Sequence, residues 1–184
     1  MALLTQKAIL ATFQQMLEEM PFDKITVSAL VRRCGVSSNT FYYHYQDIFA
    51  LLEVWLEQLL RGYLTGGADW REATKALMRD CRAHPAMVYH LFNSLSRDRL
   101  ERYVFTLSDD VFERQVGRLA QGRDIPPEML RSITGFCRYA YVGFFLQFLW
   151  DKMSGDIDRS VEQMGVLFRT FVSQALDNAE KRDN

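Results

Sequence analysis

The stretch from Thr26 to Tyr45, TVSALVRRCGVSSNTFYYHY, contains two short helical patterns separated by Gly35. Thr26 precedes the first pattern, where a side-chain hydroxyl caps free backbone N–H groups. Gly35 follows the pattern, where a left-handed turn favours a residue without Cβ. Ser37 stands at the cap position of the second pattern, SNTFYYHY. The apolar residues of the first pattern recur at i, i+3, i+4 and i+7, one face of an α-helix: Val27, Leu30, Val31 and Cys34.

Two helices joined by a turn of three to four residues that contains glycine form the helix-turn-helix pattern. In this motif the second helix lies in the major groove of DNA, and its N-terminal residues reach base edges. An amphipathic helix is predicted before the motif, over residues 3–19, and it ends before Pro21 because the residue preceding proline disfavours the α region. The apolar stripe of this helix is predicted to contain Leu4, Ile9, Phe13, Met16 and Leu17.

The rest of the chain also predicts helices. Among 184 residues there are only four prolines and ten glycines, and long stretches contain neither, which favours an all-α fold over a sheet with many turns. Gly66 and Gly67 are the clearest break in composition. We predict a helix-turn-helix domain over residues 1–46 and a helical regulatory and dimerisation domain over residues 47–184, with residues 47–64 linking the two. The predicted helices of the second domain cover residues 47–64, 69–83, 85–95, 97–121, 127–151 and 156–179.

The charge of the chain gives little support to nucleic-acid binding. The formal net charge is −1, and residues 1–46 carry four basic and three acidic side chains. Any DNA binding must therefore depend on the local placement of donors rather than on a strongly basic surface.

The cysteines and the apolar runs predict a cytoplasmic protein. Three widely spaced cysteines do not form a disulfide framework, and a reducing compartment is the default for such a chain. The N-terminus has no signal-peptide pattern. The longest near-apolar run, Tyr139 to Trp150, is too short as a helix to cross a bilayer, so we expect a buried helix and no membrane partner.

The N-terminal third resembles the TetR family of bacterial transcriptional regulators over residues 5–52. The residues that carry the resemblance are Ile25-Thr26-Val27, Cys34-Gly35-Val36-Ser37, Thr40-Phe41-Tyr42-Tyr43-His44-Tyr45 and Leu51-Leu52. The segment NTFYYHYQDIFALL is also similar to sequences of a subgroup named after a regulator of dihydroxyacetone kinase genes. The resemblance implies an all-α fold with a three-helix DNA-binding domain and a C-terminal helical domain for dimerisation and ligand binding.

The resemblance also implies roles for individual residues. Thr26 matches a hydroxyl that contacts phosphate, whereas Phe41 and Tyr45 match apolar positions that pack inward, as their i, i+4 spacing allows. At least one of the two intervening tyrosines is expected to be exposed. The candidate DNA-binding residues are Thr26, Ser37, Ser38, Asn39, Thr40, Tyr42, Tyr43 and His44.

Two positions depart from the family pattern. Family members often have glycine where this chain has Asn39, whose amide suits bidentate reading of adenine. They often have lysine where this chain has Ile48, so a common phosphate-directed cation is absent here. Arg32 and Arg33 are the nearby cations expected to compensate.

The sequence favours neither an enzyme nor a metalloprotein. It has no nucleophile elbow, P-loop or glycine-rich dinucleotide fingerprint. Cys81, His84 and His90 are the only Cys/His group, but Pro85 starts a new helix within it and a fourth ligand is missing. We therefore predict no enzymatic activity, no metal and no cofactor.

The C-terminal domain carries two further expectations. Its aromatic and methionine residues suit either an ordinary core or a small-molecule pocket, with His90, Arg138, Tyr139 and Gln147 as candidate ligand-binding residues. The last two helices have more apolar surface than one buried face needs, and the resemblance implies that they form a two-fold homodimer through residues 127–179.

The resulting prediction is a dimeric, ligand-responsive repressor that binds a palindromic operator in double-stranded DNA. The alternative is a helical dimeric regulator or interaction module controlled by a protein partner, and acting as an activator, rather than by a small ligand. The low basicity of residues 1–46 and the missing cation at Ile48 motivate this alternative.

Overall fold

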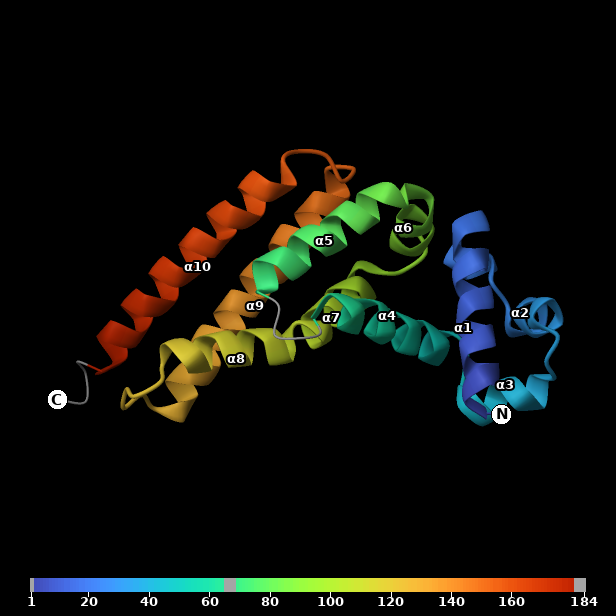
Figure 1. The fold of residues 1–184 in the computed structure, drawn as a ribbon, viewed down its shortest axis with the longest axis horizontal. Helices are drawn as coiled ribbons and strands as arrows, with labels where there is room; N and C mark the ends of the chain where they lie inside the picture. The colour runs from blue at the N-terminus through green and yellow to red at the C-terminus, as the bar shows by residue number, and fades with distance from the viewer. Residues whose placement is uncertain (1, 65–68, 181–184) are drawn as a thin grey trace. The chain divides into compact units, whose positions relative to one another are not determined.

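A computed structural model describes residues 2–64 and 69–180, so the predicted break at Gly66 and Gly67 lies outside the described residues. The described residues form ten α-helices and one short 3-10 helix, which confirms the all-α prediction (Figure 1). They form two compact units, here called the first unit (residues 1–65 and 80–100) and the second unit (66–79 and 101–184). No described helix is long and apolar enough to span a membrane.

The first unit begins with α1 (Ala2–Glu19), which the sequence predicted almost to its ends. Its first buried residue is Ile9, and Phe13 and Leu17 are completely buried on the same face. Leu4 was predicted to belong to this apolar stripe, but it is exposed because the first two turns of α1 extend beyond the core.

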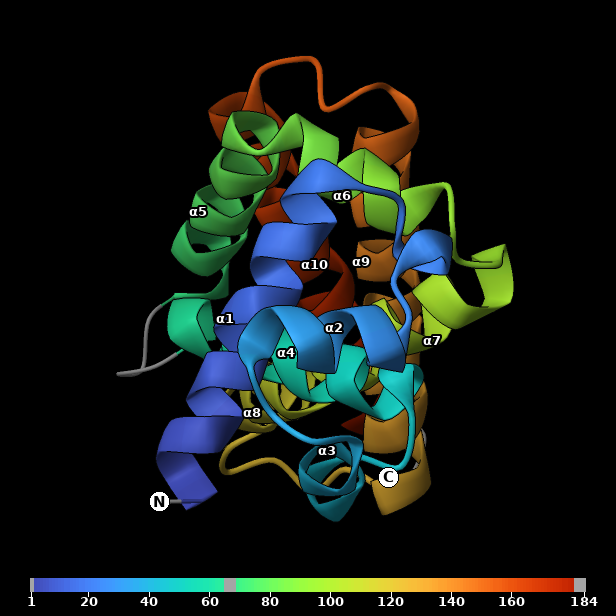
Figure 2. The same cartoon turned by 90° about the vertical axis from the view of Figure 1, so that its right-hand side faces the viewer.

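A short 3-10 helix, η1 (Phe22–Lys24), connects α1 to α2 (Val27–Cys34) and α3 (Ser38–His44). Figure 2 shows α2 lying across α1, with α3 toward the N-terminal end of α1. The ring of Phe13 contacts those of Phe22 and Trp55 edge to face, each at 6.1 Å between centroids. These contacts fasten α1 to the connector and to α4 (Ile48–Leu64).

Asp47 caps α4, as its position in the sequence predicted. Its carboxylate Oδ1 accepts the backbone N–H groups of Phe49 and Ala50, both at 2.8 Å. The first unit also contains α6 (Pro85–Phe92), which packs on α1 and starts with proline in its first turn, as predicted. The His90 ring nitrogen Nδ1 lies 2.6 Å from the backbone carbonyl oxygen of Leu17.

The second unit includes most of α5 (Trp70–Ala83), together with α9 (Pro127–Trp150) and α10 (Ile157–Glu180). Trp70 is at the centre of the aromatic packing of the second unit. Its ring centroid lies 5.3 Å from that of Phe168 and 5.8 Å from that of Phe112. The buried core cluster consists of Trp70, Phe112, Val116, Ala120, Ile125, Ile133, Cys137, Phe168, Val172, Leu176 and Ala179.

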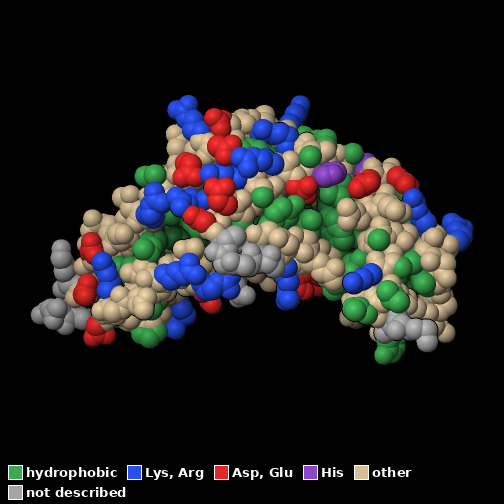
Figure 3. All heavy atoms as spheres, in the orientation of Figure 1, with side chains coloured by type: hydrophobic (Ala, Val, Ile, Leu, Met, Phe, Trp, Pro, Cys, Tyr) green, Lys and Arg blue, Asp and Glu red, His purple; other side chains and the backbone are tan. Residues whose placement is uncertain are grey.

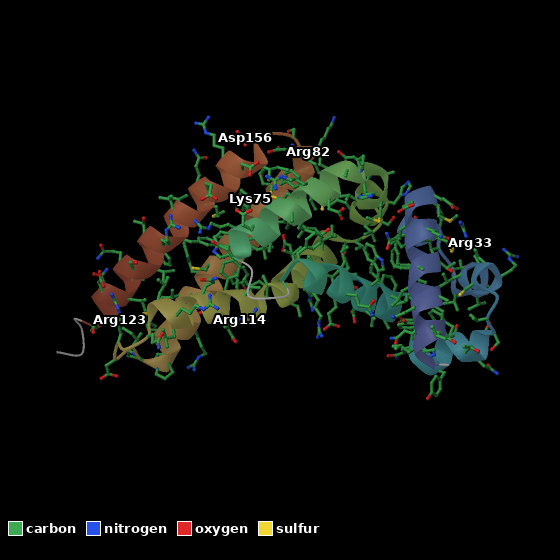
Figure 4. The ribbon with its side chains drawn as sticks, viewed as in Figure 1. Arg33, Lys75, Arg82, Arg114, Arg123 and Asp156 are labelled. Carbon is green, nitrogen blue, oxygen red and sulfur yellow. The ribbon has the colours of Figure 1, made fainter. Side chains whose placement is uncertain are left out.

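An ion-pair network joins α5 to α10 within the second unit. Lys75 Nζ donates to Glu162 at 2.6 Å and to Glu72 at 2.7 Å, and only 9% of the Lys75 side chain is exposed. Arg79 pairs with Asp158 at 2.6 Å. Figure 3 shows acidic and basic side chains interspersed over these helices, and Figure 4 shows Lys75 between them. The hydrogen bond with Glu162 raises the pKa of Lys75, so the ammonium remains charged where it is nearly buried.

The prediction of one helix over residues 97–121 is wrong, because the structure has α7 (Arg97–Leu107) and α8 (Asp109–Leu119) with a break at Ser108. The Ser108 hydroxyl donates to the backbone carbonyl of Phe105 at 2.9 Å. Arg138 Nη2, from α9, donates to the same carbonyl oxygen at 2.9 Å. Hydrogen bonds from side chains to backbone carbonyls compete with the backbone hydrogen bonds of a helix. Here one of the two donors, Arg138, is far from Phe105 in the sequence.

The turn between α9 and α10 has a strained backbone. It was predicted from Met153, Ser154, Gly155 and Asp156, but two non-glycine residues in it have left-handed backbones: Lys152 and Met153, each with φ of 56°. The Met153 side chain is buried, whereas that of Lys152 is exposed. A left-handed backbone costs about 1–2 kcal/mol for a residue with Cβ.

Replacing Lys152 with glycine is therefore expected to raise the free energy of unfolding by about 0.5–1 kcal/mol, the relieved strain less the added entropy of the unfolded chain. Urea unfolding followed by circular dichroism measures the change. Lys152→Ala is the control, because it removes the charge but keeps Cβ. Equal stabilisation by both variants would contradict an origin in backbone strain.

Candidate nucleic-acid interface

The turn between α2 and α3 has the geometry that the sequence predicted. The Thr26 side chain accepts the backbone N–H of Ala29 at 3.2 Å and so caps α2. Gly35 ends α2 in the left-handed conformation, with φ of 72°. Leu30 and Val31 are buried, so the packing of α2 fixes the direction in which the chain enters α3.

Two aromatic residues hold α3 against the rest of the first unit. Phe41 is completely buried and Tyr45 nearly so, which confirms the expected inward face, and their ring centroids are 5.5 Å apart. Burial raises the pKa of the Tyr45 phenol, so it remains neutral under physiological conditions. Because one side of this short helix is buried, its other side faces solvent.

The exposed side of α3 carries most of the candidate DNA-binding residues. Ser38 and Asn39, in its first turn, are exposed. Tyr42 and Tyr43 are 57% and 81% exposed, so both tyrosines face solvent where at least one was expected to. His44, in the last turn, is half-buried, with its ring centroid 5.0 Å from that of Tyr43.

The remaining candidates, Thr26, Ser37 and Thr40, act as caps or pair with caps. Ser37 Oγ accepts the Thr40 backbone N–H at 3.1 Å and lies 2.8 Å from Thr40 Oγ1. A hydroxyl that accepts a backbone N–H still has its own proton to donate, and a phosphate oxygen is a suitable acceptor. Seven of the eight candidates thus lie on α3 or at its cap, and Thr26 caps the neighbouring helix.

Arg33, one of the two cations expected to compensate for Ile48, is less available than expected. Arg33 makes two hydrogen bonds to the carboxylate of Glu19, Nη1 to Oε2 and Nη2 to Oε1, both at 2.5 Å (Figure 4). These bonds lower the pKa of Glu19 and raise that of Arg33, so both groups remain charged. Arg33 can therefore replace the cation missing at Ile48 only if its ion pair with Glu19 breaks. Arg32 is exposed and is the other candidate for this role. A separation of 14 residues gave no sequence signal for the pair.

The candidate ligand-binding residues are spread over both units. His90 lies in the first unit, where it contacts the Leu17 carbonyl. In the second unit, the Arg138 guanidinium lies 3.7 Å above the Phe105 ring, and the exposed Tyr139 ring is 4.7 Å from the same ring. Gln147 donates to Asp151 at 2.9 Å. The structure therefore brings Arg138 and Tyr139 together around Phe105 and gives the other two separate partners.

The Cys/His group of the first unit has no metal-site geometry. Burial, and then the Asp80 carboxylate, raises the pKa of the Cys81 thiol to about 12, so it is protonated at neutral pH. The His84 ring contacts the backbone carbonyl of Asp80 at 3.1 Å, and His90 faces α1. Across residues 2–64 and 69–180, no three side chains of the metal-binding types come together.

Two family profiles match the sequence. The profile described as "Transcriptional regulator C-terminal region" matches residues 68–170, which is more than half of the chain. The profile described as "Bacterial regulatory proteins, tetR family" matches residues 9–54, which include α2 and α3. A sequence search of curated proteins gives no match.

Solved structures with a similar fold include the dihydroxyacetone kinase operon activator DhaS, with a TM-score of 0.62 and 15% identity over 97% of this chain and 99% of that chain. A TetR transcriptional regulator from Streptococcus agalactiae 2603V has a TM-score of 0.60 and 22% identity over 93% of this chain and 94% of that chain. At sequence identities this low, the similarity to these two structures shows a shared fold only.

Proposed function

The chain belongs to the TetR family of bacterial transcriptional regulators, and from this premise we propose that it acts as a homodimer with two copies of α3 in successive major grooves of a palindromic operator. The observation that carries the proposal is the exposed face of α3. A short helix that buries Phe41 and Tyr45 while it exposes an amide and two phenols is suited to contact base edges and phosphates. Such a regulator acts in the cytoplasm, where the DNA is.

The proposed dimer face lies on α9 and α10. On α9, Phe136, Tyr139 and Trp150 are exposed, and on α10, Val166, Leu167 and Phe171 are exposed. The Phe136 and Phe171 rings stack at 4.3 Å between centroids, so the exposed apolar surface continues from one helix to the other. Contiguous apolar surface of this kind marks an interface in a soluble protein.

A second copy of the chain suits this face. In a two-fold contact the same surface serves both partners, and two exposed polar residues of the face, Gln147 and Gln174, are uncharged. The charged side chains of α10 that pair with α5, Asp158 and Glu162, already have partners inside the second unit. The face is therefore largely apolar, which suits burial against a second copy of the same surface.

Control by an effector forms a separate part of the proposal. A ligand that prefers one separation of the two DNA-binding units would shift the population of dimers that fit the operator. Of the candidate residues, the dimer proposal places Tyr139 and Gln147 on the face between copies, which leaves Arg138 and His90 as ligand candidates. Repression is the regulatory direction proposed, and a reporter fused to the operator distinguishes it from activation.

The proposed function is tested by fluorescence anisotropy with duplex DNA from upstream of the protein's own gene. Wild-type protein is expected to bind a specific duplex more tightly than a scrambled one by a factor of about 10³ or more. Changing Tyr42 and Tyr43 together to alanine should weaken that binding at least tenfold, because base and phosphate contacts are lost. The measurement is repeated at several salt concentrations, since phosphate contacts are salt-dependent.

Gln58→Ala is the matched control, because Gln58 is exposed on α4 of the same unit but lies outside the proposed interface. This variant should bind as the wild type does. A folded dimer without specific affinity for any genomic duplex would contradict DNA binding and favour the alternative, a regulator controlled through a protein partner.

A further inference from the structure

The recognition helix α3 has an unusual chemical composition for reading bases. Its sequence, SNTFYYH, contains no arginine or lysine. A bidentate arginine or lysine contact to guanine O6 and N7 is the commonest specific contact in the major groove. The helix that faces the bases in the proposed function therefore lacks the side chains that most often select a G·C pair.

The nearest cations of the motif do not fill this role. Arg33 lies on α2 and is held by two hydrogen bonds to Glu19. Arg32 also lies on α2, outside the helix that enters the groove. His44 is able to donate to guanine, but it is in the last turn of α3, half-buried between the rings of Tyr43 and Tyr45.

Asn39 is the side chain of α3 best placed to read a base. It is the second residue of the helix and is exposed, and the N-terminal residues of a recognition helix are those that reach base edges. No hydrogen bond to a described residue engages its side-chain amide. The neighbouring hydroxyls of Ser37 and Thr40, in contrast, bond to each other.

We infer that Asn39 is a specificity-determining residue that selects an A·T pair in each operator half-site, an inference that rests on the proposed DNA-binding function. The Asn39 amide oxygen accepts from adenine N6, and its NH₂ group donates to adenine N7, which is the bidentate pattern for this base. The exposed ring of Tyr43 supplies an apolar surface for a thymine methyl group nearby. The base pair that Asn39 contacts in each half-site is therefore A·T rather than G·C.

The test begins with selection of binding sites from a pool of randomised duplexes by the full-length protein. Each conserved A·T pair of the selected half-site is then replaced by G·C, and separately by 7-deazaadenine, which removes only the N7 acceptor. At one pair per half-site, both replacements should weaken wild-type binding about tenfold or more. Asn39→Ala should bind the original and the two altered duplexes within about twofold of one another, because the amide is gone.

Gln58→Ala is again the control, since Gln58 is exposed on α4 of the same unit and lies outside the proposed interface. This variant should retain the preference for the A·T pair. Selected half-sites that conserve only G·C pairs, or an Asn39→Ala protein that keeps the wild-type preference at every position, would overturn the inference while leaving DNA binding intact. A protein that selects no sequence at all would overturn the proposed function, and the inference with it.

Discussion

Replacing Leu167 with arginine is expected to convert the proposed dimer into a monomer and to abolish operator binding. Leu167 is 65% exposed at the centre of the apolar face of α10, so the substitution leaves the core of the second unit unchanged. In a two-fold interface both copies carry the new charge. Two unpaired charges at about 2 kcal/mol or more each would weaken dimerisation on the order of a thousand-fold. A monomer places only one α3 on the DNA, so the affinity gained from the second half-site is lost.

Sedimentation at micromolar protein and anisotropy with operator DNA measure the two effects. Gln58→Arg is the control, because it introduces the same charge at an exposed position of α4 that lies outside the proposed dimer face. This variant should remain dimeric and bind DNA. A Leu167→Arg protein that sediments as a dimer would show that another surface joins the copies. Circular dichroism checks that both variants retain the helical fold.

The sequence was sufficient where the determining interactions are local. The caps at Thr26 and Ser37 and the left-handed Gly35 each depend on residues within four positions, and all three were predicted. The inward face of α3 followed from the spacing of Phe41 and Tyr45. A helix-turn-helix is a local motif, so most of the candidate interface was recognisable before the fold was known.

The sequence was insufficient where distant residues meet. At the break near Ser108, the Phe105 carbonyl accepts a hydrogen bond from Arg138, 33 positions later in the chain. The pairing of Arg33 with Glu19 likewise depends on how α2 lies across α1. Neither contact can be predicted from the local spacing of residue types. The sequence therefore predicted one unbroken helix over residues 97–121, and it predicted an Arg33 that is free to compensate for Ile48.

The candidate ligand-binding residues also show that the sequence does not predict which distant residues come together. A pocket requires polar groups that converge from several elements, and residue type alone does not give their directions. Arg138 and Tyr139 are adjacent in sequence and both contact Phe105, whereas His90 faces α1 in the other unit. Of the four candidate residues, only Arg138 and Tyr139 share a contact, and His90 and Gln147 have partners elsewhere.

Replacing Phe41 with alanine is expected to lower the free energy of unfolding of the first unit by about 3–5 kcal/mol. Phe41 is 0% exposed, and its ring contacts those of Tyr42 and Tyr45. A helix of seven residues is not stable by itself in water, so α3 depends on this side chain for its structure. The variant should therefore lose specific DNA binding even at temperatures where the second unit remains folded.

Hydrogen exchange measured by mass spectrometry localises the effect, because amides of α2 and α3 should lose protection while those of α9 and α10 keep it. Tyr43→Ala is the matched control, since Tyr43 is 81% exposed on the same helix. It should change unfolding by no more than about 0.5 kcal/mol while still weakening DNA binding. The pair of variants separates the two roles of the aromatic residues in α3, because one face of the helix holds it in place and the other is the face proposed to contact DNA. Unchanged protection of α3 in Phe41→Ala would contradict the anchoring role.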